Sequence, residues 1–199
     1  MKKWTSMILA LTLLGTALLI LPVYSATGVY DSVIRLHVLA NSDSEADQAL
    51  KLKVRDAVLV QTEALLTDVT TREGAQAVLA EHLDTLQTVA EETLALAGAP
   101  STVSVSLGEE EYPRRAYEHA ALPAGEYLSL RVMIGEAEGQ NWWCVLFPPM
   151  CLSAASAERE SSCLAAGLTE GQYRFITGAD GAGYRVRFKL VEMARELFD

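Results

Sequence analysis

The sequence is poor in the side chains that most often carry metal or nucleophilic chemistry, with three histidines and three cysteines among 199 residues. Basic residues are also few: 16 Lys and Arg stand against 26 Asp and Glu, which gives a formal net charge of −10. An acidic surface repels nucleic acid and anionic lipid headgroups, so the composition argues against both as partners. A basic or amphipathic protein surface is the better electrostatic match.

Short motifs of catalysis and metal binding are also missing. No serine has the flanking glycines of a nucleophile elbow, and no glycine-rich loop is followed by the Lys-Ser/Thr pair of a phosphate-binding loop. Asn41, Asp43 and Glu45 match the first, third and fifth positions of a calcium loop. The sixth and twelfth positions, which need glycine and glutamate, hold Ala46 and Leu52. We therefore expect no enzyme, no metal or other cofactor, and no small-molecule substrate.

One long uncharged apolar run lies at the N-terminus, from Met7 to Leu21, after a short basic end. The pattern predicts either a signal peptide over residues 1–25, cut between Ser25 and Ala26, or a retained anchor that keeps the chain in contact with a membrane. In both cases the rest of the chain is delivered across a membrane. Without residues 1–25, which contain two lysines and no acids, the formal charge is −12. We expect residues 30–199 to form a single domain.

A strand followed closely by a helix is the strongest structural signal in the chain. Apolar and polar residues alternate over 34–38, as in a strand with one buried face. Ser42 and Glu45 have the spacing of a capping box, and apolar residues then recur at helical intervals to about Leu66. We interpret this unit as a fold nucleus rather than an active site.

The remaining pattern adds helices and strands in turn. A second helix is predicted from a capping box at Thr70 to a glycine cap at Gly98. Strands are predicted over Val103–Leu107, which the acidic run after it ends or frays, and over Tyr127–Ile134. Trp142–Phe147 is apolar on both faces, which is typical of a central strand. The last segments are expected to be a short helix over 158–166, irregular surface over 167–183 and a final helix over 185–198.

These elements predict an α+β fold of two layers after the N-terminal signal or anchor helix. Two long helices joined by a short link pack antiparallel, and they cover a small, mostly antiparallel sheet.

The cysteines leave two interpretations open. Cys144 and Cys151 flank Pro148 and Pro149, where a reversal of the chain would allow a disulfide, and the alternative is two buried thiols. If their strands were neighbours, Cys144 and His37 could form the Cys-His pair of a secreted hydrolase acting on cell-wall peptide. The residues beside Cys144 supply no cation that would lower its pKa, so this is the second choice.

Two blocks of the sequence carry a resemblance to a known family. IRLHVLANSDSEADQALKLKVRDAV and YPRRAYEHAALPAGEYLSLRVMIGEAEGQNWWCVLFPPMC, which lie within residues 30–151, resemble the stage II sporulation protein R family of endospore-forming bacteria. The resemblance implies an intercompartmental signal that is made in the forespore and exported into the space between the two septal membranes. There it would trigger a membrane-embedded aspartic protease of the mother cell to process pro-sigma factor E. The resemblance supplies no catalytic residues.

Several polar and aromatic residues are candidates for contact with such a partner. Arg114 and Arg115 are the only adjacent pair of arginines, on a chain that is otherwise acidic. Of two adjacent tryptophans in a strand, one packs inward and the other faces outward. The contact candidates are His37, Asp43, Arg114, Arg115, Trp142 and Trp143.

Overall fold

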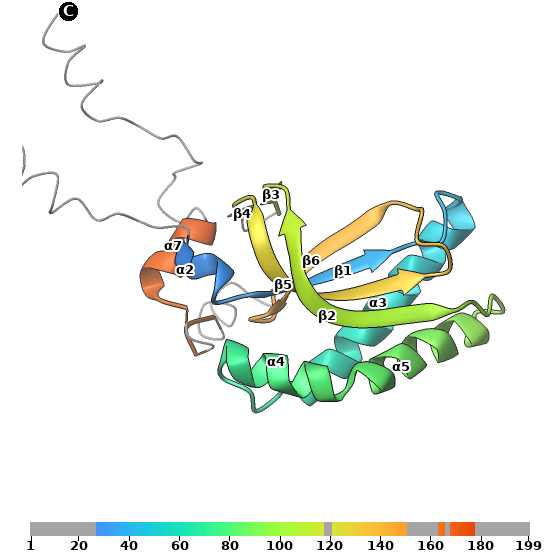
Figure 1. Ribbon diagram of the computed structural model, residues 1–199, viewed down its shortest axis with the longest axis horizontal. Coiled ribbons are helices and arrows are strands. Elements are labelled where there is room, and N and C mark those ends of the chain that lie inside the picture. The colour runs from blue at the N-terminus through green and yellow to red at the C-terminus, as the bar shows by residue number, and fades with distance from the viewer. Residues whose placement is uncertain (1–26, 118–120, 151–162, 166–167, 178–199) are drawn as a thin grey trace, which may run out of the picture.

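The computed structural model describes residues 27–117, 121–150, 163–165 and 168–177. The predicted N-terminal segment, with its cleavage site at Ser25 and Ala26, lies outside them. A four-stranded sheet carries helices α3, α4 and α5 on one face, while α2, α7 and a small two-stranded sheet lie at one end of the molecule (Figure 1). The elements are α2 (Thr27–Tyr30), β1 (Ile34–Leu39), α3 (Glu45–Leu65), α4 (Arg72–Glu81), α5 (Leu83–Leu96), β2 (Val103–Tyr112), β3 (Arg115–Ala116), β4 (Ala121–Leu122), β5 (Gly125–Ile134), β6 (Asn141–Phe147) and α7 (Glu170–Thr177).

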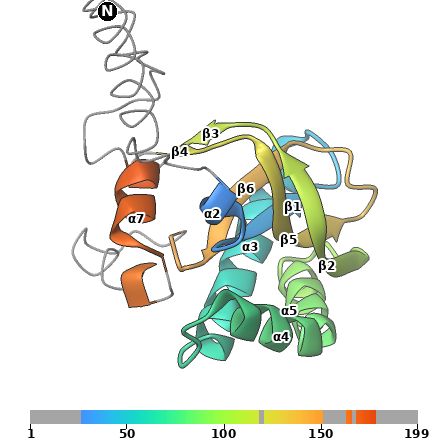
Figure 2. The same cartoon turned by 60° about the vertical axis from the view of Figure 1, so that its left-hand side comes forward.

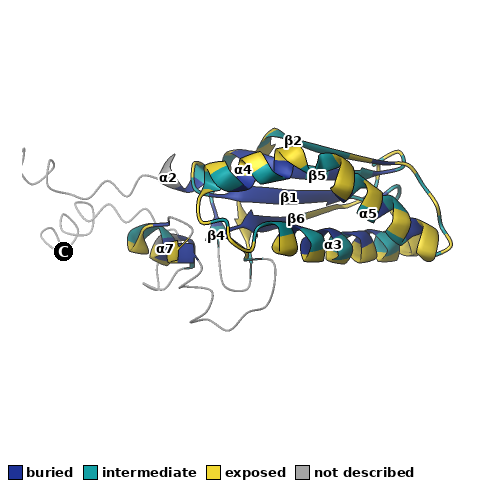
Figure 3. Cartoon of the chain, turned by 90° about the horizontal axis from the view of Figure 1, so that it is seen from below, coloured by how far each residue is buried: buried dark blue, intermediate teal, exposed yellow. Residues whose placement is uncertain are grey.

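The strand order in the main sheet is β2-β5-β1-β6, and Figure 3 shows the four strands side by side. Strand β1 is parallel to β5, whereas the β1–β6 and β2–β5 pairs are antiparallel. The predicted α+β fold with a mostly antiparallel sheet is confirmed. The prediction that Trp142–Phe147 forms a central strand is wrong, because β6 lies at the edge. Its run of apolar residues reflects two apolar clusters that bury its two faces, which does not require a neighbouring strand on each side.

Apolar side chains at alternate strand positions fill the space between the sheet and the three helices. Ile34, Leu36 and Val38 of β1 are fully buried there, as are Leu130 and Val132 of β5. We call this side of the sheet the apolar face. The helices contribute residues at intervals of three or four positions: Val54, Val58, Leu79, Leu86, Ala90 and Leu94.

Helix α3 begins at a different cap from the one predicted. Its N-cap is Ser44, whose Oγ accepts a hydrogen bond from the Asp47 backbone N–H at 3.1 Å. Ser42 instead donates its hydroxyl to the Asp47 carboxylate at 2.5 Å, and Asn41 donates to the same oxygen at 3.0 Å. These bonds, that from Ser42 first, lower the pKa of Asp47. The predicted capping box of Ser42 and Glu45 is therefore wrong, because Ser42 is used to hold the preceding loop.

The second predicted helix is two helices, α4 and α5, separated at His82. The His82 backbone leaves the helical region with φ −110° and ψ 18°, and its Nδ1 lies 2.8 Å from the Val78 carbonyl oxygen. Apolar residues stay in phase across this break, so the sequence pattern does not reveal it. The N-cap of α4 is Thr71 rather than Thr70, and Gly98, with φ +74°, follows α5 as predicted.

The C-terminal part departs most from expectation. Residues 163–165 are helical, and the rest of the predicted helix over 158–166 lies outside the described residues. Helix α7 occupies a segment predicted to be irregular; Thr169 and Gln172 cap it reciprocally, a capping box that the sequence reading missed. The predicted helix over 185–198 lies outside the described residues. Within the described part, no helix has both the length and the apolarity to cross a membrane.

Two loops far apart in the sequence lock together at one end of the sheet. Asn41 Oδ1 accepts a hydrogen bond from the Glu136 backbone N–H at 3.1 Å, and Asp43 Oδ1 accepts one from the Gln140 backbone N–H at 2.8 Å. A Cβ at Gly139 would lie 2.3 Å from a backbone oxygen of the facing loop, so only glycine fits there. The contact candidate Asp43 thus has a structural task.

Candidate functional site

Polar and aromatic side chains gather on the side of the sheet that faces away from the three helices. Strand alternation puts them there, because every second residue of each strand points to this side. We call this group the polar face: Arg35, His37, Glu110, Tyr112, Tyr127, Ser129, Asn141 and Trp143. At the end near Arg35 it is covered by a second apolar cluster that includes Val29 of α2 and Ile176 of α7.

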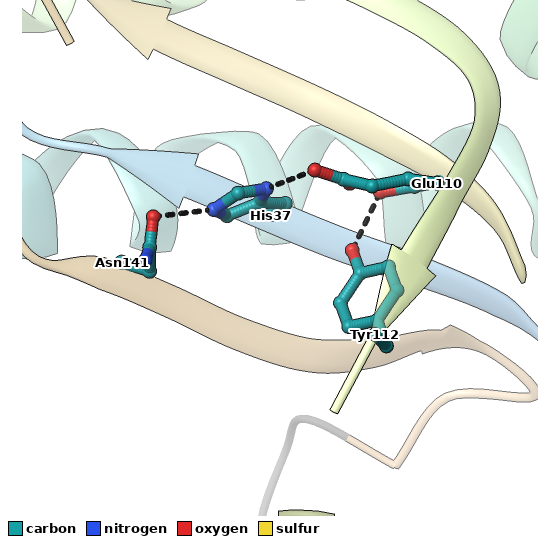
Figure 4. Close-up of polar contacts among 5 residues, drawn as sticks. His37, Glu110, Tyr112 and Asn141 are labelled. Carbon is teal, nitrogen blue, oxygen red and sulfur yellow. Dashed lines mark hydrogen bonds and ion pairs between the residues drawn. The ribbon is translucent and has the colours of Figure 1, made fainter. Parts of the chain in front are cut away.

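His37 is held at both ring nitrogens (Figure 4). Its Nδ1 lies 2.8 Å from Glu110 Oε1, and its Nε2 lies 2.8 Å from Asn141 Oδ1. The ring also packs against Tyr112 and Trp143, with centroids 6.2 and 5.4 Å apart, and the residue is only 6% exposed. A general base needs a ring nitrogen that can reach the substrate proton. With both nitrogens engaged, this arrangement orients His37 and ties β1 to β2 and β6.

Tyr112 joins the same group from the end of β2. Its hydroxyl lies 2.6 Å from Ser129 Oγ, and both residues are buried. Burial is the main reason why the pKa of Tyr112 is raised well above its ordinary value, and the hydrogen bond with Ser129 opposes this shift. The hydroxyl is therefore neutral over the physiological pH range and serves as a hydrogen-bonding group.

Arg35 is a fully buried cation. Its Nε donates to the Cys144 carbonyl oxygen at 2.9 Å and its Nη2 donates to the Tyr117 hydroxyl at 2.5 Å. Its Cζ lies 4.2 Å from the ring centre of Tyr112 and 5.1 Å from that of Tyr127. Among the described residues it makes no ion pair with a carboxylate. Aromatic rings, a carbonyl oxygen and a hydroxyl thus replace part of its hydration shell, while its buried Nη1 has no hydrogen-bond partner among the described residues.

Tyr117, the acceptor of the Arg35 hydrogen bond, is itself largely withdrawn from water. Burial raises its pKa, and the positive charges of Arg35 and then Arg115 oppose that rise. Burial thus outweighs the nearby positive charges in setting the direction of the shift.

Sequence reasoning did not single out Arg35, Glu110 or Tyr112. The available signal was the alternation in β1, which places Arg35 on the same side as His37. The partners of His37 and Arg35 lie far along the chain: Glu110 comes 73 positions after His37, and Cys144 comes 109 positions after Arg35. No local pattern encodes those pairings.

Cys144 lies on the other side of the sheet from His37. It stands opposite Leu36 in the β1–β6 register and belongs to the apolar cluster beneath the helices, whereas His37 stands opposite Trp143. The Cys-His pair of the hydrolase hypothesis is therefore wrong. Cys144 is disulfide-bonded. The predicted partner, Cys151, lies outside the described residues, so that pairing stays a prediction.

The two tryptophans of β6 point to opposite sides. Trp142 points to the helix side, is 37% exposed, and has the Arg55 guanidinium of α3 at 4.3 Å from its ring centre. Trp143 points to the polar face, is half-buried, and has the Arg115 guanidinium at 4.0 Å from its ring centre. Both rings therefore carry a stacked arginine.

The six contact candidates do not form one patch. His37 is buried, Asp43 lies in the interlocked loops, and Arg114 is exposed just before β3. Among the six, Arg115 stacks on Trp143, while Trp142 lies on the other side of β6. Within the described residues there is also no group of three or more His, Cys, Asp or Glu side chains placed to hold a metal ion.

The fold and the polar face define an α+β domain whose sheet buries polar side chains on one side, among them Arg35, His37 and Ser129. A sequence model of the family described as Stage II sporulation protein R (spore_II_R) matches residues 30–157. The chain is also 36% identical over 184 residues to "Stage II sporulation protein R" of Bacillus subtilis (strain 168), covering 84% of this chain and 82% of that relative. It therefore belongs to the stage II sporulation protein R family. No solved structure matches the chain.

Proposed function

We propose that this chain is a secreted signalling protein of sporulation that activates the membrane-embedded aspartic protease of the mother cell, so that pro-sigma factor E is processed. Its membership of the stage II sporulation protein R family is the observation that carries the proposal. In this proposal the chain leaves the forespore, enters the space between the septal membranes and binds the extracytoplasmic side of the protease. The apolar N-terminal run, which suits an exported chain, supports this route.

The geometry of the polar face supports a binding role in preference to a catalytic one. His37 has both ring nitrogens engaged, and Cys144 points away from it. Arg35 is enclosed by tyrosines, so it does not offer its charge to a substrate. These side chains hold the four strands in register, and the outer surface of the domain is what a partner meets.

Activation by binding sets a thermodynamic requirement. A bound protein shifts its partner between inactive and active states only as far as its affinities for the two states differ. We therefore propose that the chain binds the assembled, active form of the protease more tightly than the inactive form.

Reconstitution in a non-sporulating bacterium tests this proposal. The full chain is co-expressed with the protease and pro-sigma factor E, and processing of the pro-factor is followed by immunoblot. We expect processing only when the chain is present and exported, so a variant without residues 1–25 that stays in the cytoplasm is the matched control. Absence of processing in cells that export the folded chain would contradict the proposal.

A further inference from the structure

Strand β6 leaves part of its backbone exposed at the edge of the sheet. In a strand paired on one side only, every second residue directs its N–H and C=O away from the neighbour. At the C-terminal end of β6 the chain folds back, and the Met150 N–H donates to the Val145 carbonyl oxygen at 3.3 Å. Within the described residues, no backbone group outside the sheet bonds to Asn141–Trp143 in this way.

The same three residues are flanked by cations. Arg55 stacks on Trp142 from the helix side and Arg115 stacks on Trp143 from the polar face, as described above. Arg55 also pairs with Asp56 at 2.6 Å, whereas Arg115 makes no ion pair among the described residues. We call Asn141–Trp143 together with Arg55 and Arg115 the Trp–Arg edge.

The composition of the Trp–Arg edge suits a protein interface. Tryptophan and arginine are the residues most enriched among those that dominate binding energy, and an exposed strand edge binds an extended segment through backbone hydrogen bonds. An added strand would run between the two stacks, with alternate side chains directed to one or the other. The chain as a whole is acidic and favours a basic or amphipathic partner, but at this edge the two arginines locally favour carboxylates on the added strand.

We infer that the Trp–Arg edge binds an extended acidic segment of the partner protein, which adds to the sheet as a fifth strand beside β6. This inference rests on the proposed function and locates the segment in the extracytoplasmic part of the protease. A second copy of this chain is the competing occupant, because Glu109 and Glu111 lie on β2, the other edge strand of the sheet.

Charge reversals in the co-expression system test the inference. Arg55→Glu and Arg115→Glu should each reduce processing of pro-sigma factor E by about tenfold or more, the loss typical of a residue that dominates an interface. Lys53→Glu is the matched control, because Lys53 is exposed on α3 two positions from Arg55. It changes the net charge by the same amount, and we expect it to keep processing within about twofold of wild type. Thermal unfolding of each secreted variant checks that the fold is retained.

Cross-linking identifies the occupant directly. Arg115→Lys keeps the charge and supplies an amine, which a water-soluble carbodiimide joins to a nearby carboxylate. We expect a cross-link from Lys at this position to an Asp or Glu of the protease, identified by mass spectrometry of the membranes.

The outcomes separate the two proposals. If the wild-type chain is exported and folded but pro-sigma factor E stays uncut, the proposed function fails. If wild-type, Arg55→Glu and Arg115→Glu chains all support processing equally, the function stands and the Trp–Arg edge is not the binding site. A cross-link to another copy of this chain, in place of the protease, would also overturn the inference.

Discussion

The two faces of the sheet are built from different chemistry. The apolar face is a continuous layer of aliphatic side chains under α3, α4 and α5, in which Leu36 and Leu130 are fully buried. The polar face buries a charge, Arg35, and an imidazole, His37, among tyrosines and a tryptophan. One face depends on the amount of apolar area removed from water, and the other depends on particular polar contacts, such as those of His37 with Glu110 and Asn141.

This difference separates stability from specificity. Aliphatic contacts tolerate exchange among residues of similar volume, whereas a buried cation tolerates very few environments. The polar face therefore helps to fix the strand order around β1, because β2 supplies Glu110 and β6 supplies Asn141 and the Cys144 carbonyl as partners of His37 and Arg35. It follows that substitutions on the two faces should differ in kind as well as in size.

The largest effect is expected on the apolar face. Leu130→Ala leaves a cavity in the central strand β5 and should lower the free energy of unfolding by about 3 kcal/mol. Leu96→Ala is the control, because Leu96 is 90% exposed and should change stability by less than about 0.5 kcal/mol. Urea denaturation followed by circular dichroism measures both values. Equal losses for the two variants would contradict the burial of Leu130 beneath the helices.

A smaller loss is expected from the buried cation. Arg35→Met keeps much of the volume but leaves the Cys144 carbonyl and the Tyr117 hydroxyl without their donor. We expect a loss of about 2 kcal/mol in the free energy of unfolding. The variant no longer buries a charge, which is favourable, but the two unpaired polar groups and the lost cation–π contacts cost more. A variant more stable than wild type would mean that Arg35 is kept for a purpose other than stability.

The pair of His37 and Glu110 should contribute less again. His37→Leu removes the group that bonds Glu110 Oε1, and we expect a loss of about 1 kcal/mol. A second substitution, Glu110→Gln, removes the charge of the abandoned carboxylate and should restore part of that loss. Denaturation of the two single variants and the double variant gives the coupling energy. A coupling energy of zero would show that the contact between His37 and Glu110 does not stabilise the fold.

The smallest effect is expected from alkaline pH. Burial raises the pKa of both Tyr112 and Tyr117 above their ordinary value of 10.0, so the folded state holds these protons more tightly than the unfolded state does. Their contribution to stability is complete below pH 10.0 and is lost as the pH rises above it. Tyrosinate absorbance should show tyrosines that ionise only as the protein unfolds, and one fewer of them in Tyr112→Phe. Ionisation of every tyrosine near its ordinary pKa would contradict their burial.

The apolar face could be predicted from the sequence, because periodicity reports burial. The alternation over 34–38 gave β1 correctly, and helical spacing gave α3 to within one residue of its C-terminal end. Burial on both faces did not reveal the position of β6, because a strand covered by two layers can still lie at the edge. The break at His82 was equally hidden, because the helices before and after it present the same face to the sheet.

The polar face could be predicted only in part. Alternation placed Arg35 and His37 together, but the pairing of His37 with Glu110 depends on the order β2-β5-β1-β6, which no local pattern contains. The sequence predicts Trp142 and Trp143 as contact residues. It does not show which arginines stack on them, because Arg55, which stacks on Trp142, comes from α3. A single sequence does not show which distant segments are in contact.

The position of β1 has a consequence for how this chain reaches its folded state. The first strand lies between β5 and β6, and Arg35 reaches its acceptor 109 positions further along. Until the segment ending at Phe147 is present, the first strand lacks at least one of its two neighbours, and the helices that follow it have no complete sheet to cover. Such dependence on late pairing delays folding. A chain that we propose is threaded outward through a narrow translocation channel would thus remain extended during its passage and become compact only on arrival.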